Sequence, residues 1–222
     1  MKKKIVLLGL LALPLVLYIY FSMSRHNSLF LPVITQNVNE LPVGKTFTDS
    51  VVQLKDKISI VGFLGTDVKK RKESIFNIEQ KINNKYRAFK NFQIVMLMPD
   101  GTQESVKEME TSLKRMGDIS NWKFVFTSPD NIEKFYGSLK VKEPLGADFG
   151  TFNVFIVDKT LNLRGRRGQT KNKLDSQYKD GYNSFSAADL HNEMTDDVKI
   201  LLREYRLALR RNNTQKGVKR EI

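Results

Sequence analysis

Apolar residues follow two alternating periods along the chain, and these predict strands and helices in turn. Residues 58–64 are almost continuously apolar, which is typical of a strand buried on both faces. Between residues 73 and 89, apolar side chains recur at spacings of three and four among polar ones, which predicts an amphipathic helix. Residues 92–98 predict a second strand, closed by a Pro-Asp-Gly turn at residues 99–101.

The alternation continues beyond this turn. Thr102 is the expected cap of a helix that ends near residue 116. Residues 122–127 predict a third strand, and Ser128 with Pro129 opens the next helix. The order of elements is therefore β-α-β-α-β-α.

The C-terminal third predicts a hairpin and a closing helix. Residues 152–157 have the composition of a strand, and residues 163–168 are its expected hairpin partner. Residues 169–184 are polar and are interpreted as an inserted loop. A capping-box-like sequence at residues 186–189 begins a long helix with an apolar stripe up to Tyr205.

The N-terminal segment predicts a membrane anchor. Residues 5–22 carry no charged side chain, and as a helix rising ~1.5 Å per residue they would reach about 27 Å, close to the thickness of the bilayer hydrocarbon. Lys2, Lys3 and Lys4 precede them, which favours a cytoplasmic N-terminus and a domain beyond the inner membrane, on its periplasmic side. A cleaved signal peptide is the alternative, but the segment lacks a small-residue cleavage site. We expect a retained single-pass anchor.

These patterns divide the chain into four parts. Residues 1–25 are the expected signal-anchor, and the polar residues 26–41 a linker. Residues 42–210 are the expected folded domain, and residues 211–222 a basic tail. The 222 residues leave material for one domain of ordinary size.

Composition excludes several classes of chemistry. The chain has no cysteine, so it cannot form disulfides, thiolate metal sites or a Cys-based redox centre. His26 and His191 are its two histidines, too few for a multi-histidine metal centre, and neither has the partners of a catalytic triad. We therefore expect no cofactor, no metal and no catalytic residue, and hence not an enzyme. The net charge of +13 indicates a basic surface that faces anionic phospholipid or an acidic partner.

Five segments resemble the SCO/SenC family. They are residues 54–63, 94–102, 121–124, 155–159 and 197–205, and the resemblance covers about residues 42 to 206. The resemblance implies a thioredoxin-like three-layer α/β sandwich, with a central mixed sheet and flanking helices. It also implies a link to the assembly of respiratory cytochrome oxidase.

The residues with which that family binds copper or handles thiols are not matched. The family's CxxxC falls on Thr66 and Lys70, or on Val68 and Lys72 in the alternative register, and its histidine falls near Gly150. None of these side chains is a copper ligand of the soft thiolate or imidazole type. The resemblance therefore implies a degenerate, redox-inactive member.

The remaining basic motifs have two interpretations each. Lys69, Lys70, Arg71 and Lys72 lie where a thioredoxin-like domain places its active-site loop; they are either a docking site for an acidic partner or a solvated charge run. Residues 164–168, Arg-Gly-Arg-Arg-Gly, are either a hairpin turn or a weak phosphate contact.

The favoured hypothesis is a membrane-anchored binding or assembly module that contacts a membrane complex. The alternatives are an enzyme with an unrecognised non-thiol site and a binder of anionic lipid or nucleic acid. Nucleic acid is disfavoured because no aromatic residues are interleaved with the basic motifs.

Overall fold

The computed structural model describes residues 12–16, 18, 30–48, 51–167 and 178–215. The predicted membrane segment, residues 5–22, lies largely outside these ranges; the part that is described, residues 12–16 and 18, is helical. Across the described ranges, no helix is both long and apolar enough to cross a membrane.

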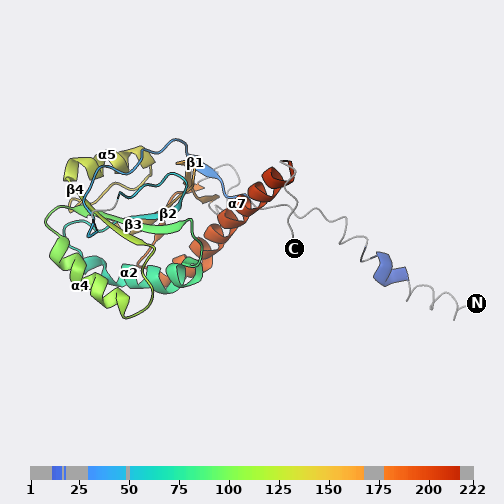
Figure 1. Ribbon diagram of the computed structural model, residues 1–222, viewed down its shortest axis with the longest axis horizontal. Helices are drawn as coiled ribbons and strands as arrows, with labels where there is room; N and C mark the ends of the chain where they lie inside the picture. The colour runs from blue at the N-terminus through green and yellow to red at the C-terminus, as the bar shows by residue number, and fades with distance from the viewer. Residues whose placement is uncertain (1–11, 17, 19–29, 49–50, 168–177, 216–222) are drawn as a thin grey trace, which may run out of the picture.

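A mixed β-sheet forms the centre of the domain (Figure 1). Its strands are β1 (Val33–Thr35), β2 (Ile58–Phe63), β3 (Phe92–Pro99), β4 (Trp122–Thr127), β5 (Asn153–Val157), β6 (Leu163–Arg164) and β9 (Tyr182–Asn183). The order across the sheet is β1-β6-β5-β2-β3-β4, with β9 paired to β5. Strands β2, β3 and β4 are parallel, whereas β5 is antiparallel to β2 and to β6.

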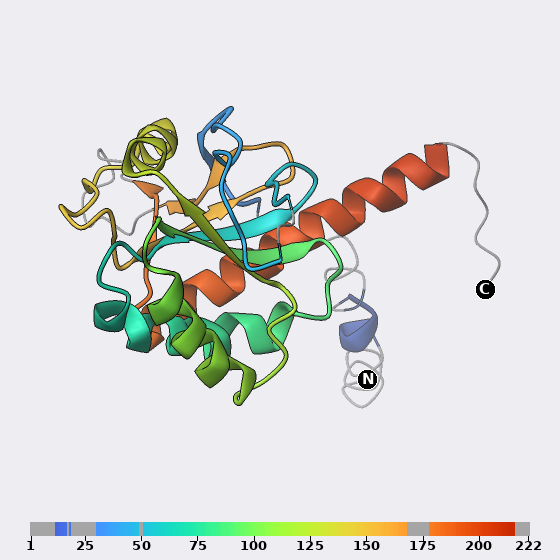
Figure 2. The same cartoon turned by 60° about the vertical axis from the view of Figure 1, so that its left-hand side comes forward.

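Helices cover both faces of this sheet. They are η1 (Lys69–Arg71), α2 (Lys72–Ile78), the π-turn η2 (Glu79–Asn83), α3 (Asn84–Tyr86), α4 (Gln103–Lys114), α5 (Pro129–Leu139), α6 (Ala187–Asp189), the π-turn η3 (Leu190–Met194) and α7 (Thr195–Gln215). Figures 1 and 2 show α2 and α4 on one side of the sheet, α5 on the other, and the end of α7 projecting beyond the body of the domain. Strands β7 (Arg166–Arg167) and β8 (Tyr178–Lys179) form a separate two-stranded sheet.

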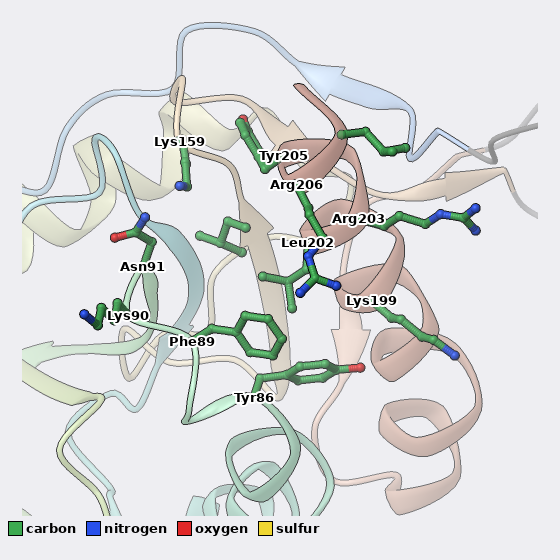
Figure 3. A pocket seen from close by; sticks show the side chains of 12 residues that line it. Tyr86, Phe89, Lys90, Asn91, Lys159, Lys199, Leu202, Arg203, Tyr205 and Arg206 are labelled. Atoms are coloured by element: carbon green, nitrogen blue, oxygen red, sulfur yellow. The ribbon is translucent and has the colours of Figure 1, made fainter. Parts of the chain in front are cut away.

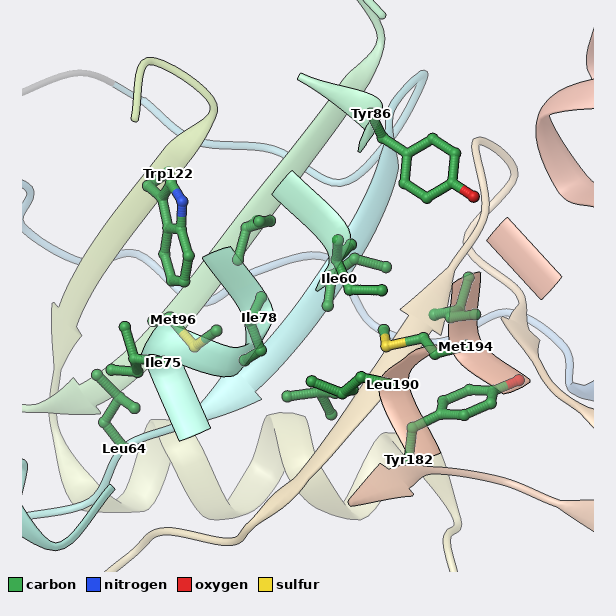
Figure 4. Close-up of a cluster of buried hydrophobic side chains, with 14 of the residues drawn as sticks. Ile60, Leu64, Ile75, Ile78, Tyr86, Met96, Trp122, Tyr182, Leu190 and Met194 are labelled. Carbon is green, nitrogen blue, oxygen red and sulfur yellow. The ribbon is translucent and has the colours of Figure 1, made fainter. Parts of the chain in front are cut away.

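Two buried cores result from the alternation of side chains along the strands. Ile60 of β2 packs with Ile75 and Ile78 of α2 in the first core (Figure 4). The next residue, Val61, points to the opposite face and belongs to the second core with α5. Because both faces of β2 and β3 are covered, every residue in these two strands is buried.

This arrangement confirms the predicted thioredoxin-like α/β fold with a central mixed sheet. The four predicted core strands are present, and Ser128 caps α5 by accepting a hydrogen bond from the backbone N–H of Asn131. Thr102 begins α4 but its side chain is not a cap. Its hydroxyl donates instead to the carbonyl of Pro99, at 2.8 Å.

The structure differs from the sequence-based boundaries at four places. Within the loop expected at residues 169–184, Tyr178–Lys179 and Tyr182–Asn183 form β8 and β9, and Tyr182 is buried. The expected linker, residues 26–41, contributes β1, which pairs with β6, and places Leu31 and Val38 in the core. The hairpin partner expected at residues 163–168 divides at Gly165 into β6 and β7. Helix α7 continues to Gln215, past the expected domain end at residue 210.

Candidate functional site

The candidate site lies where β2 ends and the chain turns towards α2. Leu64 forms an isolated antiparallel bridge with Gly150, and the N–H of Thr66 donates to the carbonyl of Asp148, at 2.9 Å. Gly65 between them has a φ of 66°, and a Cβ there would lie 2.5 Å from the Asp148 carbonyl oxygen. Only glycine fits this conformation and this close approach.

Arg71 turns its side chain inward at this edge and is 3% exposed. Its Nη1 donates to the carbonyl of Leu64 at 2.8 Å and to Oδ2 of Asp148 at 2.6 Å. Nη2 donates to the second carboxylate oxygen of Asp148, at 3.1 Å. The guanidinium also lies 5.3 Å from the ring centroid of Phe152, in a cation–π arrangement. The result is a bidentate ion pair that ties the start of α2 to the loop before β5.

A tight loop at residues 146–150 presents Asp148. The N–H of Gly146 donates to the carbonyl of Gly150, and the N–H of Phe149 to that of Gly146. Phe149 has a φ of 61°, an uncommon conformation for a large side chain. Burial tends to raise the pKa of Asp148, but the hydrogen bonds and charge of Arg71 outweigh it and hold that pKa below its usual value. The pair is therefore ionised at neutral pH.

Gly150 leaves the space that the guanidinium occupies. A Cβ at this position would lie 2.5 Å from Cζ of Arg71 and 2.7 Å from each of its terminal nitrogens. Position 150 is where the SCO/SenC resemblance implies a histidine. In this chain the guanidinium of Arg71, the last residue of η1, occupies that volume instead.

The structure separates the four predicted docking residues. Lys69, Lys70 and Lys72 are exposed, whereas Arg71 is buried. The interpretation of Arg71 as part of an exposed docking run is therefore wrong, because its side chain pairs with Asp148 inside the fold. The sequence held a signal for this: Arg71 precedes Ile75 and Ile78 at helical spacing, on the face that packs against the sheet.

The positions equivalent to the family's cysteines fall beside this ion pair. Thr66 is exposed at the edge, and Val68 is buried in the core. Nowhere in the described ranges do three His, Cys, Asp or Glu side chains form a group that could hold a metal ion. Both carboxylate oxygens of Asp148 already accept from Arg71, and the exposed carboxylate of Asp67 accepts from the backbone N–H of Lys70.

The other basic motif is also engaged inside the protein. Arg164 is buried and pairs with Asp158 at 2.9 Å and with Glu204 at 2.5 Å. Arg166 pairs with Asp197, whose Oδ2 also accepts from the hydroxyl of Tyr182. These arginines therefore hold β6 and β7 against α7, which leaves no support for the phosphate-contact interpretation of residues 164 and 166. Gly168 lies outside the described residues.

His191 lies exposed on η3, close in the chain to two acids that are paired elsewhere. Asp189 and Glu193 both accept from the ammonium group of Lys179. The geometry thus agrees with the expectation that His191 is a polar surface residue.

Comparison with known proteins supports the fold and not a family assignment. No protein-family model matches the chain, and no curated protein has a matching sequence. Among solved structures, the chain is similar to BsSco, a member of the Sco family of cytochrome c oxidase assembly proteins. The TM-score is 0.50 at 16% identity, over 77% of this chain and 94% of that one.

Two other similar structures are thiol-disulfide proteins. A thiol:disulfide interchange protein from Chlorobium tepidum TLS has a TM-score of 0.47 at 18% identity, over 77% of this chain and 97% of that one. The thioredoxin domain of a thiol-disulfide oxidoreductase from Bacteroides vulgatus has a TM-score of 0.40 at 20% identity, over 59% of this chain and 89% of that one.

These comparisons correct one expectation. We expected that the chain is not an enzyme, yet the solved structures similar to it include a thiol-disulfide oxidoreductase and a thiol:disulfide interchange protein. This chain has no cysteine, and a shared fold does not by itself show an activity, so enzyme status is established neither way.

Proposed function

We propose that this chain is a membrane-anchored binding module of Sco-like fold that assists the assembly of a membrane complex related to respiratory cytochrome oxidase. In this proposal it uses protein–protein contacts in place of the copper and thiol chemistry of the family it resembles. Residues 1–25 anchor it as a single pass in the inner membrane, with the domain on the periplasmic side.

The observation that carries the proposal is the Arg71–Asp148 ion pair. The fold is kept, but the edge where the resemblance implies redox or metal ligands holds a bidentate, buried pair. The ion pair fixes the shape of this edge and leaves it without a thiol or a metal ligand. Lys69, Lys70 and Lys72 then stand exposed outside the pair, at the start of α2.

An acidic partner surface would be attracted to this edge. Several like charges at one interface accelerate association by an order of magnitude or more, whereas exposed charges each contribute only about 0 to 1 kcal/mol to folding. Binding and stability can therefore be changed separately here.

Affinity purification of the full chain from detergent extracts tests the proposal. The charge-reversal variant carries Lys69→Glu, Lys70→Glu and Lys72→Glu and leaves Arg71 in place. A matched control reverses three exposed lysines elsewhere, Lys55, Lys107 and Lys134. Mass spectrometry should find heme-copper oxidase subunits with wild type and control, and about tenfold less with the edge variant.

Two results would count against this function. The first is the absence of any oxidase subunit from the wild-type purification, and the second is equal recovery by the edge variant. Alkaline carbonate washing tests the anchor separately: the protein should stay with the membrane fraction, and a soluble product with an N-terminus near residue 25 would refute retention.

A further inference from the structure

A groove lies along α7, where strands β2 and β3 begin, whereas the candidate site lies where β2 ends. It has a volume of about 750 Å³, and it runs between α7, the end of α3 and the starts of β2 and β3 (Figure 3). None of the residues of the candidate site lines it.

The floor of the groove is aromatic and aliphatic. Tyr86 and Phe89 approach from the α3 side, and Leu202 and Tyr205 from α7 (Figure 3). Phe89 is 44% exposed and Leu207, at the same groove, is 40% exposed. Two large apolar side chains that line the groove are thus exposed to solvent, which favours a ligand with an apolar part.

The rim is cationic. Lys90, Lys159, Lys199, Arg203 and Arg206 line the groove, and no acidic residue does. Lys199, Arg203 and Arg206 follow one another at spacings of four and three on α7, so they share one face of the helix. Lys159 lies 5.2 Å from the ring centroid of Tyr205.

These cations are not neutralised within the domain. In the part of the chain that the structure describes, the ion pairs involve none of Lys90, Lys199, Arg203 and Arg206. A cluster of unpaired cations beside an apolar floor fits an amphiphile with an anionic head.

The described chain enters the domain close to the groove. The N–H of Leu31 donates to Oε1 of Glu204, at 2.6 Å, and its carbonyl accepts from Arg164. The chain therefore joins the domain at α7, beside groove residues Arg203 and Tyr205. Only eight residues lie between Leu31 and the end of the apolar segment at Ser22, and even a fully extended chain spans at most roughly 30 Å from Ser22 to Leu31.

We propose that this groove binds an anionic phospholipid of the membrane in which the chain is anchored. The phosphate lies against Lys199, Arg203 and Arg206, and the acyl chain against Phe89 and Leu207. Lipid binding of this kind would orient the domain on the bilayer, with α7 towards the headgroups. The inference rests on the membrane anchor of the proposed function but not on docking through Lys69, Lys70 and Lys72.

Native mass spectrometry of the full chain in a neutral detergent tests the groove. Phosphatidylglycerol and phosphatidylcholine are titrated separately, and glycerol 3-phosphate is added as a competitor that has the anionic group without acyl chains. The groove variant carries Lys199→Glu, Arg203→Glu and Arg206→Glu, and the matched control again carries Lys55→Glu, Lys107→Glu and Lys134→Glu. All six side chains are exposed, and thermal unfolding checks that both variants fold.

Phosphatidylglycerol should bind wild type and control about tenfold more tightly than phosphatidylcholine, and the groove variant should lose this preference. A second variant, Phe89→Ser with Leu207→Ser, should weaken phosphatidylglycerol binding several-fold because it removes the apolar contact.

Three outcomes would overturn the inference. They are equal binding of the two lipids by wild type, unchanged phosphatidylglycerol binding by the groove variant, and competition by glycerol 3-phosphate as strong as that by the lipid, which would indicate a site for free phosphate. If the protein stays in carbonate-washed membranes but shows no lipid preference, the groove inference fails alone and the proposed anchor stands.

Discussion

The guanidinium of Arg71 occupies the space that any side chain at position 150 would need, so Arg71 and Gly150 depend on each other. A Cβ on Gly150 would lie 2.5 Å from Cζ of Arg71. Arg71 cannot yield easily, because Asp148 and the carbonyl of Leu64 hold its two terminal nitrogens. Gly150→Ala should therefore lower the free energy of unfolding by about 1–3 kcal/mol, as overpacking does.

A double-mutant cycle in urea unfolding checks this relationship. In an Arg71→Ala background the same Gly150→Ala change should cost less than about 0.5 kcal/mol, since the clash is gone. Gly137→Ala is the control: a Cβ there meets nothing within 4 Å, so in the last turn of α5 it should raise the free energy of unfolding by about 0.5–1 kcal/mol. If the effects of Arg71→Ala and Gly150→Ala on the free energy of unfolding add in the double variant, the two positions are independent and the proposed relationship is wrong.

Removal of Arg71 alone should destabilise the domain substantially. Arg71→Ala leaves the carboxylate of Asp148 without its partner, and breaking a buried pair costs about 3–5 kcal/mol. Because Asp148 is 26% exposed, water can partly replace the guanidinium, and we expect roughly 2–4 kcal/mol. Lys70→Ala, at an exposed neighbour, should change stability by less than about 0.5 kcal/mol. Equal effects of the two substitutions would contradict the clamp role of Arg71.

Protonation of Asp158 should lower the stability of the domain in acid. Burial tends to raise the pKa of Asp158, but hydrogen bonds from Asn162, Arg164 and Thr160 outweigh it and hold that pKa below its usual value. Because this pKa is lowered by folding, ionised Asp158 contributes fully to the free energy of unfolding above the unfolded-state pKa of about 3.9. This contribution is lost as the pH falls through the lower, folded-state pKa.

Urea unfolding of wild type and Asp158→Asn between pH 7 and pH 2 measures this effect. The variant should be less stable at pH 7, and the difference should narrow below about pH 3.9. Asp100→Asn, at an exposed acid in the turn after β3, should keep the acid profile of wild type. A difference between wild type and Asp158→Asn that does not change with pH would refute the assignment.

Copper should not bind in stoichiometric amount. Thr66, Lys70 and Gly150, or Val68 and Lys72 in the other register, supply no thiolate or imidazole. Metal analysis of the full chain after copper loading and desalting should give far less than one copper per protein. Tight one-to-one copper, retained in the presence of a chelator, would contradict this prediction.

The sequence by itself determined the four central strands, β2 to β5, and the helices that pack against them. The apolar run of β2 and the periodic stripe of α2 reflect burial against the same sheet, and burial of this kind leaves a local pattern that can be read without a structure. The absence of cysteine likewise excluded thiol chemistry before any fold was known. The resemblance to the SCO/SenC family pointed to the fold, and the sheet topology agrees with it.

Only the tertiary structure decided which charged side chains are exposed and free to contact a partner. Arg71 is one of four consecutive cations, and it is buried because Asp148, 77 residues away, pairs with it. The pairing of β1 with β6 and the groove between Phe89 and Tyr205 also join distant segments. Such contacts depend on how the chain is brought together across the sheet, and a local period of hydrophobicity contains no information about the partner that a polar side chain meets there.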